Sequence, residues 1–316
     1  MSGTRSPSRK EPVTEALIVS HGQPSCPVSG EAQLELLTQQ IRSRLPDWHI
    51  RSATLAAPGT FERELRECGG IPFVYPVFMA DGWFTKKALP ERTGGREVRQ
   101  LSPLGLHPML PHRTVQLLKQ EAEQRGWSLH SCNVMIAAHG SETGPAAADC
   151  ALYFAKRVRA LMPFKKKIHT GFLAQEPFLT RVAQVSTPRT LLLPFLAGTG
   201  SHLTEDIPDA LVEGGFKGVL LPAVGEADFI ADLIAHSLST AWLKAKNFDP
   251  VSQHRTVEHQ SAGVEIDAET VVPGGTDPGI ARCAQPDLSS CNRLRVVSLL
   301  LKKMRNFRSS MKRQAA

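Results

Sequence analysis

Residues 191–208 read LLLPFLAGTGSHLTEDIP, and the prediction of the fold starts from this stretch. It begins as a continuous apolar run, which is typical of a buried strand in a parallel sheet. The chain then passes through a Gly-Thr-Gly-Ser turn to His202, which lies just before an acidic turn and Pro208. A lone histidine after a strand is often only an exposed loop residue. The pattern indicates a site only if the rest of the chain supplies partners for His202.

A second junction of this kind shows that the chain repeats itself. An apolar run at 134–138 ends in His139-Gly140-Ser141, and a run at 16–20 ends in His21-Gly22, 118 residues earlier. The same offset, without a gap, relates four further pairs: Leu55-Ala56 and Leu173-Ala174, Pro76 and Pro194, Gly82 and Gly200, and Pro90 and Pro208. We infer an internal duplication into two halves of similar length.

The alternation of strand and helix patterns predicts an α/β fold. Each half is expected to be a small α/β unit around a parallel sheet, with a ligand cleft between the halves beyond the carboxyl ends of the strands. In the first half the expected strands are 16–20, 50–55, 71–78 and 98–106, and the expected helices lie around 34–41, 61–68 and 115–123. The expected divisions are a flexible arm at 1–14, a first half at 15–128, a second half at 129–247 that carries the metal site, and a mostly disordered basic tail at 248–316.

Charge and composition exclude several classes of function. The net charge is +7, but residues 16–250 hold 24 basic against 22 acidic residues, so nucleic-acid binding by the folded part is not indicated. No apolar run approaches the roughly 18 residues that span a bilayer, and the polar N-terminus is unlike a secretory signal. The six cysteines form no closely spaced set, so we expect a cytoplasmic protein without a disulfide framework. Residues 293–313 are basic and partly apolar, and a surface-binding helix and an inert tail remain equal alternatives.

Three candidate metal ligands each follow a predicted strand of the second half. They are His139, Glu176 and His202. Carboxyl ends of parallel strands share one edge of a sheet, so these side chains are expected to converge. Two imidazoles and a carboxylate suit cobalt, nickel, ferrous iron or zinc, and Asp206 would lie on the same side of the turn as His202, as a supporting partner.

The first half keeps only part of this set. The offset places His21 opposite His139, but Pro58 opposite Glu176 and Phe84 opposite His202. We therefore expect one working site, in the second half, facing a first half that forms a wall of the cleft.

The patterns Ala138-His139-Gly140-Ser141, 173–177 (LAQEP) and 200–208 (GSHLTEDIP) together resemble the sirohydrochlorin chelatases, the CbiX/SirB type of class II chelatase. The resemblance spans about residues 16–245. It implies insertion of a divalent metal, cobalt or ferrous iron or else nickel, into sirohydrochlorin or a related carboxylate-rich tetrapyrrole of siroheme or cobalamin biosynthesis. It implies a metal that is substrate rather than cofactor, no nucleotide or organic cofactor, and His139, His202 and Glu176 as the working residues.

The expected substrate contacts surround this set. They are Gly140, Ser141, Gly200 and Ser201 in the second half, and His21, Trp83 and Phe84 in the first. Trp83 and Phe84 offer an apolar surface against which a macrocycle could lie. A monomer and a homodimer are both compatible with two halves in one chain.

Two other functions share part of this pattern. A non-catalytic carrier of tetrapyrrole or metal would show the same ligands, so it remains an alternative. A histidine phosphatase would need an arginine directly before its histidine, and Ser20 and Ala138 occupy those positions, which leaves this a remote alternative.

Overall fold

The structure is a computed structural model that describes residues 13–162 and 168–247, all within one compact unit. Its β-strands form two four-stranded sheets in which every pairing is parallel. The first sheet has the order β2-β1-β3-β4 and comprises β1 (Thr14–Ser20), β2 (Trp48–Thr54), β3 (Phe73–Val77) and β4 (Arg99–Gln100). The second has the order β6-β5-β7-β8 and comprises β5 (Asn133–Ala138), β6 (His169–Phe172), β7 (Thr190–Pro194) and β8 (Val219–Leu220). The predicted α/β fold with two parallel sheets is confirmed.

The helices connect successive strands, as parallel pairing requires. In the first half they are α1 (Pro27–Arg42), α2 (Thr60–Glu67), the π-helical turn η1 (Phe84–Ala88), α3 (Leu89–Arg92), the 3₁₀ turn η2 (Leu104–Leu106) and α4 (Leu110–Gln124). After the 3₁₀ turn η3 (Leu129–Ser131), the second half has α5 (Ala146–Leu161), α6 (Leu179–Ala183), the π-helical turn η4 (His202–Asp206), α7 (Ile207–Glu213), the 3₁₀ turn η5 (Val224–Glu226) and α8 (Ile230–Asn247).

One expected strand, 98–106, is mostly not a strand. Only Arg99 and Gln100 pair with β3, and the chain then turns into η2. The segment folds back against the end of β3, where the Gly105 amide donates to the Phe78 carbonyl oxygen at 2.9 Å. Only glycine fits this close approach, because a Cβ at Gly105 would lie 2.0 Å from the Met79 carbonyl oxygen. The other predicted elements of the first half are present with shifted ends, and β1 already begins at Thr14.

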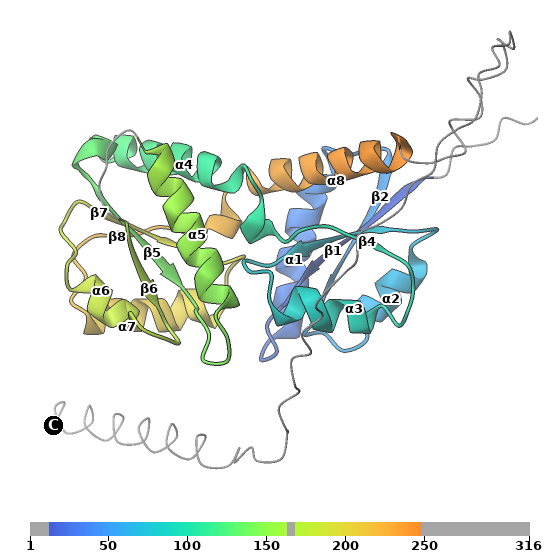
Figure 1. Cartoon of the computed structure of the whole chain (residues 1–316), viewed down its shortest axis with the longest axis horizontal. Coiled ribbons are helices and arrows are strands. Elements are labelled where there is room, and N and C mark those ends of the chain that lie inside the picture. The colour runs from blue at the N-terminus through green and yellow to red at the C-terminus, as the bar shows by residue number, and fades with distance from the viewer. Residues whose placement is uncertain (1–12, 163–167, 248–316) are drawn as a thin grey trace, which may run out of the picture. The chain divides into compact units, whose positions relative to one another are not determined.

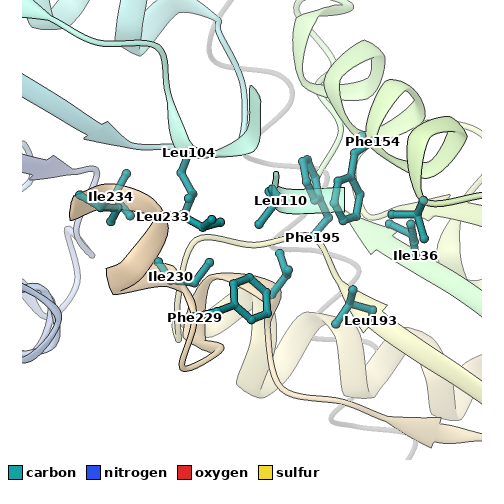
Figure 2. Close-up of a cluster of buried hydrophobic side chains, with 14 of the residues drawn as sticks. Leu104, Leu110, Ile136, Phe154, Leu193, Phe195, Phe229, Ile230, Leu233 and Ile234 are labelled. Carbon is teal, nitrogen blue, oxygen red and sulfur yellow. The ribbon is translucent and has the colours of Figure 1, made fainter. Parts of the chain in front are cut away.

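The last helix of each half packs against the other half. Helix α4 packs against α5 of the second half, and α8 packs against α1 of the first (Figure 1). The exchange is reinforced by Asp232 on α8, whose carboxylate binds Arg44 and lies 3.9 Å from Arg113. Figure 2 shows the apolar side chains that meet here, with Leu110 of the first half beside Phe154 and Phe195 of the second, and Leu104 beside Leu233 of α8. The sequence pattern did not predict this exchange.

The repeat is present in three dimensions, with one length change. The offset of 118 residues relates η1 to η4, but β4 and β8 are offset by 120, as are η2 and η5. Gly225 shows the same close approach as Gly105, because a Cβ there would lie 2.2 Å from the Ala197 carbonyl oxygen. The two extra residues of the second half therefore lie between the π-helical turn and the last strand, where α7 is longer than α3.

Some predictions fall on residues outside the described ranges. These are most of the arm at 1–14 and the whole tail at 248–316. Among the described helices, none combines the length and apolar character needed to cross a membrane.

Candidate functional site

His139 and His202 come together at the carboxyl edge of the second sheet. His139 directly follows β5, and His202 opens η4 after the neighbouring strand β7. Their ring centroids are 4.4 Å apart with an interplanar angle of 64°. Both residues are exposed, so the pair is open to solvent and to ligands. The predicted convergence of these two residues is present.

The turn after β5 depends on Gly140. Its φ of +72° lies in the left-handed region, and a Cβ there would approach the Gln175 side chain to 2.8 Å. Gln175 Oε1 instead accepts a hydrogen bond of 2.8 Å from the Ser141 amide, which ties this turn to the end of β6. Gln175 is the neighbour of the predicted ligand Glu176, and nothing in the sequence pattern distinguished the two.

The π-helical turn that carries His202 has a local cause. Pro208 has no N–H to donate to Thr204, and its ring crowds that carbonyl, so regular α-helical bonding fails. The Ile207 amide instead donates to the carbonyl of His202, five residues back. The first half repeats this at Pro90, where the Leu89 amide donates to Phe84. Such turns are frequent at functional sites.

Hydrogen bonds orient both imidazoles in the same way. His139 Nδ1 lies 2.9 Å from the Gly140 carbonyl oxygen, and His202 Nδ1 lies 2.6 Å from Asp206 Oδ2. Carbonyl and carboxylate oxygens only accept, so Nδ1 carries the proton in each ring. The Nε2 lone pair of each neutral imidazole is then free to bind a metal ion or a proton.

The predicted third ligand, Glu176, does not join the pair. It is exposed, and its Oε2 accepts a hydrogen bond of 3.3 Å from the Phe178 amide two residues on. Within residues 13–162 and 168–247, no three His, Cys, Asp or Glu side chains gather closely enough to hold a metal ion. Glu176 nevertheless stays at the same edge, because the Ala174 amide donates to the His139 carbonyl oxygen at 2.9 Å.

The predicted contacts Gly200 and Ser201 form the start of the π-helical turn. The Gly200 carbonyl oxygen accepts from the amides of Leu203 and Thr204, and a Cβ on Gly200 would meet nothing within 4 Å. Thr199 Oγ1, just before them, donates to Glu226 Oε1 at 3.0 Å. These hydrogen bonds hold the loop where it begins, at Thr199, and leave open space beside Gly200.

The first half reproduces this geometry with a phenylalanine in place of the second histidine. The rings of His21 and Phe84 are 4.4 Å apart with an angle of 80°, and His21 Nδ1 lies 2.8 Å from the Gly22 carbonyl oxygen. Phe84 also stacks on Phe78 at 5.8 Å and meets Trp83 edge-on at 5.1 Å. His21 and Phe84 are half-buried, unlike the open pair in the second half.

Trp83 lies near the second half. It is 60% exposed, and a Cβ on its neighbour Gly82 would be 3.8 Å from the Cβ of Ala146, where α5 begins. The loop between His139 and Ala146 therefore runs from the histidine pair toward the turn of the first half that contains Trp83 and Phe84, the aromatic turn.

A cavity of about 390 Å³ lies elsewhere, against β2. Its lining includes Glu35 and Arg42, which pair with each other, and Arg51, whose Nη1 lies 3.4 Å from Glu64 Oε2. None of its residues belongs to the predicted site. The cleft between the halves stays a prediction.

Comparison with known proteins gives the family. A family model described as CbiX matches residues 133–241. A solved CbiX, described as the terminal enzyme for biosynthesis of siroheme in denitrifying bacteria, is 34% identical, with a TM-score of 0.65 over 72% of this chain and 99% of that chain. The chain belongs to the CbiX/SirB family of class II chelatases. No curated protein sequence matches it.

More distant chelatases share the fold. SirB from Bacillus subtilis with Fe³⁺ is 14% identical, with a TM-score of 0.58 over 74% of this chain and 98% of that chain. SirB from Bacillus subtilis subspecies spizizenii in complex with cobalt is also 14% identical, with a TM-score of 0.54 over 74% and 97%. The CbiX model matches the half that contains His139, Glu176 and His202, which is the half predicted to carry the site.

Proposed function

We propose that this CbiX-family protein inserts a divalent metal, cobalt or ferrous iron or else nickel, into sirohydrochlorin or a related reduced tetrapyrrole of siroheme or cobalamin biosynthesis. The observation that carries the proposal is the pair of exposed histidines, 4.4 Å apart, whose Nε2 atoms are left free by their Nδ1 hydrogen bonds. Family membership supports the same activity.

A site with an incomplete set of protein ligands suits a metal ion that is passed on to the macrocycle. A structural site closes around its ion with four protein ligands, whereas a site that passes its ion on must keep positions open. His139 and His202 supply two imidazoles, and the remaining positions are available to water, to Glu176 and then to the pyrrole nitrogens of the macrocycle. Borderline divalent ions accept this mixture of nitrogen and oxygen ligands.

Insertion also requires a proton acceptor. As the metal bonds to the four macrocycle nitrogens, two pyrrole N–H protons are released, and the macrocycle gains the metal in their place. A neutral imidazole is a suitable acceptor near neutral pH. We assign this role to the histidine pair. Glu176, at the same sheet edge, would offset part of the metal's charge and relay a proton to water.

The macrocycle would lie against the aromatic turn of the first half. Trp83 presents an exposed apolar ring, and Phe84 and His21 form the half-buried surface beneath it. A flat ring system gains favourable contact area on such a surface. Gly140, Ser141, Gly200 and Ser201 would contact the opposite side, beside the histidines.

The direct test follows the absorption spectrum of metal-free sirohydrochlorin on addition of cobalt or ferrous iron. A chelatase converts many equivalents of macrocycle per chain above the rate without protein. A carrier of tetrapyrrole or metal stops after one equivalent, and that result would replace the proposal with the carrier function. His202→Ala serves as control, because it removes a ligand from an exposed position without opening the core.

A further inference from the structure

Asp206 holds His202 by a side-chain contact that His139 and His21, the histidines that follow the central strands β5 and β1, do not make. Its Oδ2 lies 2.6 Å from His202 Nδ1, and both side chains are about half exposed, at 50% and 47%. His139 and His21 take backbone carbonyls of Gly140 and Gly22 as their acceptors instead. His202 thus depends on one side chain for its orientation.

We propose that Asp206 is the positioning residue of His202: it keeps the proton on Nδ1 and so directs the Nε2 lone pair to the incoming metal. A carboxylate only accepts, so it selects one tautomer, and its charge makes the imidazole a stronger ligand. The effect on metal insertion rests on the proposed function, whereas the effect on the tautomer does not.

The first half supports this assignment by contrast. The position equivalent to Asp206 is Ala88, which is buried, and the position equivalent to His202 is Phe84. Both copies keep the π-helical turn, so the turn itself does not require an acid. The carboxylate occurs in the copy that has a histidine for it to orient.

Replacing Asp206 by asparagine should allow His202 to adopt its other tautomer. An amide can donate as well as accept, so it can hydrogen-bond to an unprotonated Nδ1 and allow the proton to move to Nε2. A protonated Nε2 cannot bind a metal. Loss of the correct tautomer is the known consequence of the same exchange beside a catalytic histidine in serine proteases.

The first experiment reads the tautomer of the metal-free full-length chain by long-range ¹H–¹⁵N NMR of the imidazoles at alkaline pH. In the parent, His202 should be protonated on Nδ1. In Asp206→Asn and Asp206→Ala the Nε2–H form should appear, while His139 serves as an unchanged internal reference. Glu205→Gln, which removes a charge from the same turn, should leave His202 as in the parent. A His202 tautomer that is the same in all four proteins would overturn the proposal.

The second experiment measures cobalt affinity and insertion kinetics. We expect Asp206→Asn to weaken cobalt binding by about 10–100-fold, the range for partners of metal ligands, with the KM for the macrocycle unchanged. Asp206→Glu should recover part of the affinity, and Glu205→Gln should match the parent. An equal loss in Asp206→Asn and Glu205→Gln would point to charge alone and contradict positioning. If the parent inserts no metal, the proposed function fails, and the tautomer and the cobalt affinity still decide the role of Asp206.

Discussion

The two halves have the same scaffold and different chemistry at one edge. Each has a central strand that is followed directly by His-Gly, a parallel neighbour, a π-helical turn and a proline that causes this turn. In both, two rings stand with centroids 4.4 Å apart. In the second half the rings are two exposed histidines, whereas in the first they are a half-buried histidine and phenylalanine.

This difference shows that the fold determines where the two rings lie. The side chain at each position determines whether the ring can bind a metal. The exchanged helices α4 and α8 pack the halves against each other around a shared apolar cluster. A phenylalanine at position 84 keeps the packing on Phe78, but its side chain has no nitrogen or oxygen that could bind a metal. The first three predictions below test this comparison between the halves.

The largest effect is expected from removing a histidine of the pair. His202→Ala and His139→Ala should each reduce metal insertion by at least about 100-fold, because removing a direct ligand costs at least as much as removing its supporting partners. Phe84→Ala should cost less than about tenfold, mainly in the KM for the macrocycle. Steady-state insertion assays measure both. Equal losses at positions 84 and 202 would mean that the halves share the chemistry.

The scaffold should respond equally in both halves. A Cβ at Gly105 would lie 2.0 Å from the Met79 carbonyl oxygen, and one at Gly225 would lie 2.2 Å from that of Ala197. We expect Gly105→Ala and Gly225→Ala each to lower the free energy of unfolding by about 1–3 kcal/mol, the range for overpacking. Urea denaturation measures the change, and Gly200→Ala, where nothing lies within 4 Å, is the control. A loss confined to one half would show that the repeat is not structurally equivalent.

Restoring the missing histidine should create a second site. Phe84→His would place two imidazoles in the first half at the spacing that His21 and Phe84 now have. We expect the number of cobalt ions bound per chain to rise by one, with weaker affinity than at the original pair, because the site is half-buried and Ala88 offers no carboxylate. Phe84→Leu is the control in equilibrium cobalt titration. An unchanged stoichiometry would mean that ring placement alone does not suffice for binding.

The smallest effect concerns a histidine that occurs in the first half only. Burial, with a smaller contribution from nearby His236, lowers the pKa of His107 from its ordinary 6.5, and its counterpart at an offset of 120 is Ala227. The unfolded chain then binds more protons at acidic pH, so stability is full above about 6.5 and falls as the pH drops through the folded pKa, by at most about 1.4 kcal/mol per pH unit.

Removing His107 should therefore flatten the acid side of the stability profile. His107→Asn keeps an acceptor for the Met109 amide, which now donates to His107 Nδ1 at 3.1 Å. Thermal or urea unfolding across the acidic range measures the slope, with the exposed His112→Asn as control. A slope unchanged from the parent would assign the acid sensitivity to other groups.

The sequence predicted those parts of the site that depend on strand ends. Parallel pairing brings residues after β5 and β7 to one edge, which was enough to predict that His139 and His202 converge. The offset of 118 residues matched His21 and Phe84 to these two positions. The contact between Asp206 and His202 also follows from their spacing of four residues. These relations are local or set by the pleated sheet, which is why a pattern can predict them.

Other features depend on contacts that a pattern does not encode. Each of the helices α4 and α8 could pack against its own half or against the other half. The apolar periodicity of the helix would be the same in both arrangements, so the sequence does not distinguish them. Gln175 accepts a hydrogen bond from the Ser141 amide, whereas Glu176 accepts one from the Phe178 amide within its own loop. β4 is short because the chain soon approaches another backbone segment closely at Gly105. A single glycine in an apolar segment does not predict such an approach.

The central claim is that one half of this CbiX-family chain holds the metal. Anomalous diffraction at the cobalt absorption edge, from crystals of the full chain soaked in cobalt, tests it most directly. We predict a peak at bonding distance from Nε2 of both His139 and His202, and none beside His21. A peak beside His21 and Phe84, or an empty His139–His202 pair, would contradict the account.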